Sequence, residues 1–109
     1  MKKKFHLALA SNNIQGTILD YSKRLGCQPC AMVSGVYALW RTDTLNVSVR
    51  HDPKCRPGEL RHLGFEDASV SQFATDFDIN GIVWESFTAE QQAQEIENAW
   101  PGTGYTPKD

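Results

Sequence analysis

The sequence predicts an α+β fold in which two related strand-helix units build one cupped, mixed β-sheet. Residues 61–66 echo residues 5–10, because in both a His is followed by Leu, a small residue and a large apolar residue. Both stretches alternate between two kinds of side chain, which is typical of a β-strand with two different faces. A helical pattern opens after each copy, at residues 11–13 and again at residues 67–69.

The two copies align at a constant offset. His6 then maps on His62, Leu7 on Leu63 and Ala8 on Gly64. If the repeat is structural, each unit offers one His from its first strand. A repeat this short also arises by chance, so it stands here as a hypothesis.

The first unit continues as a helix and three strands. Residues 14–25 carry apolar side chains at helical spacing, after three good N-cap residues and before Gly26, which favours a left-handed stop. A strand entered after Cys30 and two strands at residues 36–40 and 45–50 follow.

The loop at residues 51–58, rich in Pro and charged residues, separates the two units. On the strand around His62, the alternation places Leu60, His62, Gly64 and Glu66 on one face, and Arg61, Leu63 and Phe65 on the other.

A possible capping box, Ser69 with Gln72, favours a short helix carrying Val70, Phe73 and Phe77. Asn80-Gly81 then predicts a tight turn. The strand at residues 82–87 places Glu85 between two apolar neighbours on one face.

A second capping box, Thr88 with Gln91, opens the final helix. We therefore predict a single domain over residues 1–109. Its first module covers about residues 4–50, a shortened second module about 59–88, and a C-terminal helix about 89–100.

Composition indicates a globular protein, with 40% hydrophobic and 22% charged residues in 109. The net charge is −2 and the only basic cluster is residues 2–4, which argues against nucleic acid as a partner. No stretch approaches the ~20 apolar residues that span a bilayer. We expect no membrane association and a cytoplasmic protein.

The chain has three cysteines, and an odd number does not make a secreted disulfide framework. Cys27 and Cys30 form a paired motif that follows a helix, unlike a thioredoxin motif, which opens one. Structural cysteines are the favoured interpretation; a redox or zinc role for Cys27, Cys30 and Cys55 stays open.

His6, His62 and Glu85 together have the composition of a 2-His-1-carboxylate metal site, which leaves coordination positions open for water or substrate. Imidazole and carboxylate suit iron, zinc, nickel or manganese, so the ligands alone do not choose the metal. The alternative is that both histidines are packed or surface residues and that Glu85 pairs with an Arg.

Four stretches resemble the vicinal oxygen chelate superfamily, which includes glyoxalase I, bleomycin-resistance proteins and extradiol dioxygenases. They are the opening strand at residues 5–9, the helix end at 18–26, the strand at 61–66 and the hairpin at 78–85. Within the superfamily, the small proteins related to arsenic-carbon lyases and cadmium-induced proteins are the most similar, because they carry His-Leu-Gly in the second module.

The resemblance implies paired modules of strand-helix-strand-strand-strand that enclose a divalent metal. His6, His62 and Glu85 fall on ligand positions, and the fourth position falls near Ser48, which is neither Glu nor His. The second module departs from the family, because Asn80-Gly81 follows the predicted helix at once and a hairpin is missing. We expect an open cup whose exposed edge is paired in a homodimer or covered by the helix at 89–100.

The resulting expectation is a small protein that binds a divalent metal and a small oxygen-bearing molecule, and whether it is an enzyme is left open. A lyase, an isomerase or a dioxygenase would fit. Glu66 is a candidate for a catalytic base or for a residue behind the ligands, and otherwise a surface Glu. Tyr37 and Trp40 are candidates for the pocket, and otherwise core. The alternatives are a metal-free small-molecule binding protein of the same fold and a structural dimer without catalysis.

Overall fold

The computed structural model describes residues 3–108 as seven strands and two helices. In chain order these are β1 (Lys3–Ser11), α1 (Ile14–Leu25), β2 (Ala31–Val33), β3 (Tyr37–Arg41), β4 (Leu45–His51), β5 (Glu59–Asp67), β6 (Ala74–Phe77), β7 (Val83–Phe87) and α2 (Ala89–Ala99). Of the basic cluster at residues 2–4, Lys2 lies outside the described residues, and Lys3 and Lys4 lie in β1.

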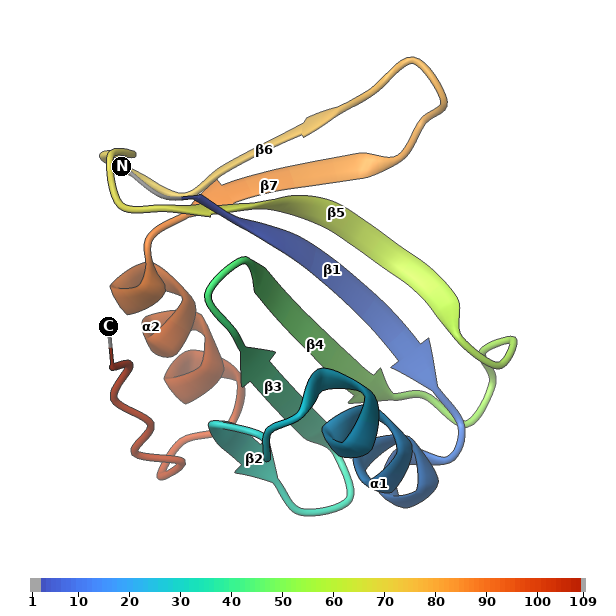
Figure 1. The fold of residues 1–109 in the computed structure, drawn as a ribbon. Coiled ribbons are helices and arrows are strands. Elements are labelled where there is room, and N and C mark those ends of the chain that lie inside the picture. Colours follow the sequence, from blue (N-terminus) through green and yellow to red (C-terminus); the bar gives the residue numbers. More distant parts are fainter. Residues whose placement is uncertain (1–2, 109) are drawn as a thin grey trace.

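All seven strands form one open sheet in the order β2-β3-β4-β1-β5-β7-β6 (Figure 1). The sheet is mixed, since β1 pairs with β4 and β5 with β7 in parallel, while the other neighbours are antiparallel. The predicted α+β class, the mixed sheet and the C-terminal helix are therefore confirmed.

The two strands that carry the sequence repeat lie side by side in the middle of the sheet (Figure 1). β1 and β5 run antiparallel, with Leu7 opposite Leu63, His6 opposite Gly64 and Ala8 opposite His62. Leu7 thus faces its own counterpart in the repeat, and His6 and Ala8 each face the counterpart of the other, as a two-fold axis through the Leu7–Leu63 pair requires. The two parallel pairs that flank this centre are also equivalent, since β4 pairs with β1 as β7 pairs with β5.

α1 packs on one face of β3 and β4, as its apolar spacing predicts. Ile14 joins a buried cluster with Ala38, Trp40, Val47 and Val49. The Asn13 side chain accepts a hydrogen bond from the Gly16 N–H at the start of the helix, and Gly26 ends it with a φ of 74°.

α2 packs on the opposite face of the sheet. Ile96 is buried there with Ala31, Tyr37 and Leu39, which alternate along β2 and β3 with the residues that face α1. The capping box of Thr88 and Gln91 is formed as predicted. The sheet is therefore covered by a different helix on each face of its β2-β3-β4 half.

The helix predicted at residues 70–77 is wrong. The Asp67 carboxylate accepts hydrogen bonds from both the N–H and the hydroxyl of Ser69, which turns the chain and leaves no capping box with Gln72. The chain then forms β6, which pairs antiparallel with β7. The shortened second module thus keeps one strand, β6, before its last strand, and it lacks the helix and a second strand.

Arg61 does not follow the predicted alternation. Ala8 pairs with His62 and the next residue, Leu9, pairs with Leu60, so Arg61 is an extra residue in β5. Such a β-bulge redirects a side chain, and Arg61 lines the same pocket as His62. Strict alternation had assigned these two residues to opposite faces.

Within residues 3–108, neither helix has the length and apolar character that crossing a membrane requires.

We propose that the β6 edge of the sheet pairs with a second copy of the chain. β6 is last in the strand order and all four of its residues are exposed, with Phe77 69% and the following Ile79 99% accessible. An uncovered edge with apolar side chains is a template for strand pairing. Sedimentation equilibrium should give twice the mass of the 109-residue chain.

A Phe77→Lys variant should sediment as a monomer, because the charge interrupts this edge. Leu19→Lys is the matched control, since Leu19 is equally apolar and 76% exposed on α1. A monomeric wild-type chain, or a dimer that survives Phe77→Lys and not Leu19→Lys, would contradict the pairing.

Candidate metal centre

Three side chains from three strands converge above the middle of the sheet. His6 Nε2 lies 3.0 Å from His62 Nε2, and His62 Nε2 lies 3.0 Å from a Glu85 carboxylate oxygen. Their candidate ligand atoms all lie within 4.8 Å of one another. His6 is only 2% exposed, and the side chains of His62 and Glu85 are mostly buried. This His/His/Glu group could hold a metal ion.

The group surrounds Gly64. His6 is the partner of Gly64 on β1, Glu85 is its partner on β7, and His62 lies two residues earlier on the same face of β5. A Cβ atom at Gly64 would lie 2.0 Å from the Glu85 carbonyl oxygen. The absence of a side chain here lets β7 approach β5 and leaves room for the three ligands.

The position of His6 is fixed from behind by Asn46. His6 Nδ1 lies 2.9 Å from Asn46 Oδ1 and 3.1 Å from the Asn46 backbone oxygen, so Nδ1 carries the proton and donates it. The Nε2 lone pair is then directed at His62 and Glu85. Burial, and then the neighbouring His62, lower the pKa of His6 below its ordinary value despite the Asn46 bonds. A neutral imidazole with a free Nε2 is the form that ligates metals.

Asn46 is itself held on all sides. Its amide exchanges a pair of hydrogen bonds with the Gln92 amide, at 2.8 and 3.1 Å, and its Nδ2 also donates to Glu66 at 2.8 Å. Asn46 is completely buried, and together with the His6 bond these contacts use its full hydrogen-bonding capacity. The network joins His6 to α2 through Gln92.

Glu66, the candidate base, lies beneath this network and outside the pocket. Its carboxylate receives two hydrogen bonds from Arg41, at 2.8 and 2.7 Å, besides the one from Asn46. Burial alone would raise the pKa of Glu66, but the hydrogen bonds and charge of Arg41 and the Asn46 bond outweigh it and lower the pKa. Such a carboxylate is a weak base, and its geometry suits holding Asn46 instead.

A pocket of about 260 Å³ lies between this face of the sheet and α2. It is lined by His6, Tyr37, Ser48, Arg50, Arg61, His62, Phe73, Glu85, Phe87, Gln92, Glu95, Ile96, Ala99 and Trp100. Tyr37, one of the two aromatic candidates, is among these residues. Trp40 is fully buried on the other face of β3, in the cluster beneath α1.

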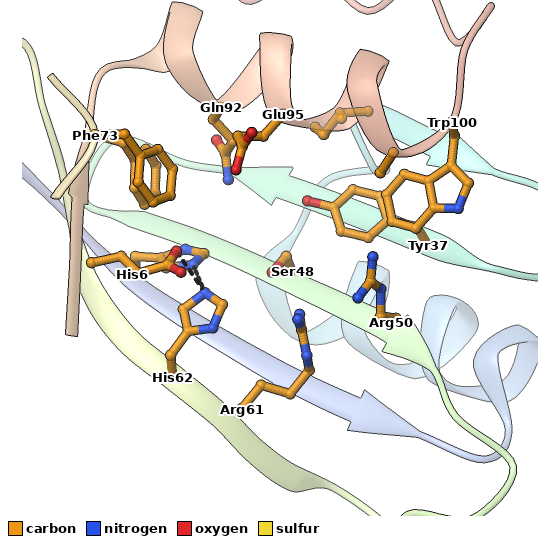
Figure 2. Close-up of a pocket in the computed structure, with 14 residues that line it drawn as sticks. His6, Tyr37, Ser48, Arg50, Arg61, His62, Phe73, Gln92, Glu95 and Trp100 are labelled. Atoms are coloured by element: carbon orange, nitrogen blue, oxygen red, sulfur yellow. Dashed lines mark hydrogen bonds and ion pairs between the residues drawn. The ribbon is translucent and has the colours of Figure 1, made fainter. Parts of the chain in front are cut away.

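The two ends of the pocket differ in chemistry (Figure 2). The His/His/Glu end has an aromatic wall, where the Phe87 ring meets His6 edge-on at 4.9 Å and stacks on Phe73. The far end carries Arg50 over the ring of Trp100, and Arg61 lies between His62 and Arg50 in Figure 2.

Tyr37 and Ser48 add two hydroxyl groups to the pocket, and Ser48 lies between its two ends in Figure 2. Burial raises the pKa of Tyr37 to about 12, so its phenol is neutral and can donate a hydrogen bond.

Ser48 occupies the place that the repeat assigns to a fourth ligand. It pairs with Ala8 on β1, as Glu85 pairs with Gly64 on β5. Since Ala8 and Gly64 are equivalent in the repeat, Ser48 is the counterpart of Glu85. The first module therefore supplies one candidate ligand, His6, and the second supplies two.

Sequence reasoning missed several residues of the pocket and of the network behind it, although two kinds of signal pointed to them. Asn46 and Arg50 share the polar face of β4 with Ser48, which lies on the same side as His6. Gln92 lies at four-residue spacing from Ile96 and Trp100, on the stripe of α2 that faces the sheet. Only Arg61 had no visible signal, since a bulge moved it.

The cysteines lie away from this centre. Cys27, Cys30 and Cys55 are all free thiols, and Cys27 packs beside the α1 core. Within residues 3–108, the His/His/Glu group is the one cluster of at least three His, Cys, Asp or Glu side chains placed to hold an ion.

Comparison with known proteins gives a likeness of fold. A solved structure described as a hypothetical protein from Staphylococcus aureus superposes with a TM-score of 0.56 at 12% sequence identity. The match covers 79% of this chain and 33% of that one, so this chain spans about a third of the other's length. Neither a family model nor a curated protein sequence matches the chain.

Gly64→Ala should destabilise the protein by about 1–3 kcal/mol, because the added methyl group overpacks the contact with β7. Urea unfolding measures this change. Ala8→Gly, at the equivalent position of β1, is the matched comparison and should cost only about 0.5–1 kcal/mol. If Gly64→Ala is as stable as the unmodified chain, β5 and β7 do not approach this closely.

Asn46→Ala should weaken metal binding by about tenfold, since residues that orient a ligating His typically account for 10- to 100-fold. We expect the lower end because the backbone oxygen of residue 46 still accepts from His6. Competition with a chromophoric chelator measures the affinity. Asn98→Ala, on the exposed side of α2, is the control. Equal metal affinities in the two variants would show that Asn46 does not support metal binding.

Proposed function

We propose that this protein binds a divalent metal ion through His6, His62 and Glu85, and beside it a small oxygen-bearing molecule. The observation that carries the proposal is the convergence of two imidazole nitrogens and a carboxylate within 4.8 Å, at one end of a pocket.

The donor set fits a transition-metal ion. Two nitrogen ligands about 2.1 Å from one ion, at about 90° to each other, lie about 3 Å apart, and the two Nε2 atoms are 3.0 Å apart. Iron, zinc, nickel and manganese all accept this mixture of imidazole and carboxylate. Three protein ligands leave coordination positions open, which is typical of catalytic rather than structural sites.

The resemblance of the sequence to the vicinal oxygen chelate superfamily supports the same proposal. Two features of the fold agree with paired modules: the antiparallel pair β1-β5 at the centre, and the parallel pairs β1-β4 and β5-β7 beside it. On this view the second module has lost its helix and one strand. We also propose that the protein works in the cytoplasm, in agreement with its cysteine content.

A metal in this position would polarise an oxygen atom of the bound molecule and stabilise negative charge developing on it. The surrounding residues would orient the ligands and the bound molecule. Asn46 keeps the Nδ1 proton of His6 in place, Phe73 and Phe87 limit access of water, and the Tyr37 phenol donates to an oxygen of the ligand. A lyase, isomerase or dioxygenase reaction could use this arrangement.

A metal-free binding protein is the second candidate, and one contact favours it. His62 and Glu85 already form a 3.0 Å pair, which satisfies both groups without an ion. In that case the far end of the pocket, where Tyr37 packs against Trp100, would hold the ligand, and metal would have no effect on its affinity.

His62→Ala should abolish stoichiometric metal binding, because it removes the ligand that contacts both others. Protein purified without chelators and analysed by plasma mass spectrometry should contain about one metal ion per chain, and the variant almost none. His51→Ala is the matched control, since His51 lies outside the group. Circular dichroism verifies the fold of each variant.

Metal-free wild-type protein that stays metal-free on addition of zinc, iron, nickel or manganese would refute the metal site. An unchanged metal content in a folded His62→Ala variant would refute the assigned ligands.

A further inference from the structure

The pocket holds two arginines that the metal proposal does not use. Arg50 extends from β4 and Arg61 from β5, and both side chains line the pocket (Figure 2). Figure 2 shows both side chains reaching into the same cavity, Arg50 near Tyr37 and Arg61 below Ser48. Two guanidinium groups therefore line one pocket.

A specific structural feature places each arginine in the pocket. The Arg50 guanidinium lies over the Trp100 ring at 4.9 Å from its centre, a cation-π contact that fixes its direction. Arg61 is the extra residue of the β5 bulge, which turns it from the face of Leu63 to the pocket. Without the bulge, only one guanidinium would line the pocket.

Neither guanidinium is neutralised by an ion pair within residues 3–108. The structure pairs Arg24, Arg41 and Arg56 with carboxylates, and Arg50 and Arg61 with none. The two acidic residues of the pocket are Glu85, which belongs to the metal ligands, and Glu95, which is exposed on α2. The fork of an arginine matches the two oxygens of a carboxylate, phosphate or phosphonate.

We infer that Arg50 and Arg61 form an oxyanion subsite, so that the ligand is a small molecule whose carboxylate or phosphoryl group is held by these two arginines rather than by His6, His62 and Glu85. The Tyr37 and Ser48 hydroxyls lie along the pocket to meet the polar atoms between the two ends. The Trp100 ring offers an apolar surface beside the anion. The inference builds on the proposed function, because it names the class of molecule held beside the metal.

The test measures oxyanion binding on metal-free protein, prepared with a chelator that is then removed. Phenylphosphonate and benzoate are the probes and benzamide is the neutral control, all titrated by isothermal calorimetry at low ionic strength. We expect at least one of the two anions to bind and benzamide not to, and the affinity to fall as salt is added. Phenylphosphonate and benzoate distinguish a phosphoryl ligand from a carboxylate.

Arg61→Gln and Arg50→Gln should each lower the affinity for the anion by about 10- to 100-fold, which is the effect of losing a charge-assisted hydrogen bond. Arg56→Gln removes the same charge from an exposed loop, where Arg56 pairs with Glu59, and should leave the affinity unchanged. Arg61→Lys keeps the charge and loses the fork, so it should give an intermediate affinity.

Anion binding that is unaffected by both pocket variants, equal binding of benzamide, or no binding of either anion would overturn the inference. Metal content of the unmodified protein, measured beside its anion binding, separates the two proposals. Metal without anion binding would overturn the subsite and keep the metal site; anion binding without metal would keep the subsite and refute the proposed function.

Discussion

The antiparallel contact between β1 and β5 is the constraint on which the rest of this structure depends. Its register places His6 opposite Gly64 and His62 opposite Ala8. Each imidazole therefore faces a residue with little or no side chain, and the two rings lean diagonally toward each other across the strand pair. A shift of one residue would send one His to the opposite face of the sheet. The small residue of the repeat is thus as important for the site as the His.

The site also depends on a buried polar network that an ordinary core would not contain. Asn46 and Gln92 are buried, and the Arg41–Glu66 pair beneath them is only about 10% exposed on each side chain. Burying such groups costs free energy unless every donor and acceptor is satisfied. Here Asn46 uses all of its bonds, so the network is rigid and holds one tautomer of His6. This chain of contacts links the sheet, α2 and the His6 ligand.

The sequence predicted the middle of the sheet better than its ends. Period-two patterns gave β1, β4, β5 and β7, and N-cap residues gave both helices, because these signals are local. The grouping of His6, His62 and Glu85 followed from the repeat and from a family resemblance, and the structure brings these three side chains together.

The failures came from competing local contacts. Ser69 resembles an N-cap residue, but its hydrogen bonds to Asp67 make a turn, and the residues after it pair with β7. Arg61 was misplaced because a bulge leaves no mark in the alternation of a single strand. The Arg41 side chain that holds Glu66 comes from β3, and no local pattern in the sequence links the two residues. Such features depend on an irregular backbone or on a partner that is distant in the sequence.

The most direct test is a crystal structure of the protein grown with zinc, with anomalous diffraction recorded at the zinc edge. The account predicts one strong peak per chain, about 2.0–2.2 Å from His6 Nε2, His62 Nε2 and a Glu85 oxygen. A peak bound elsewhere, or imidazole rings on opposite faces of the sheet, would contradict it.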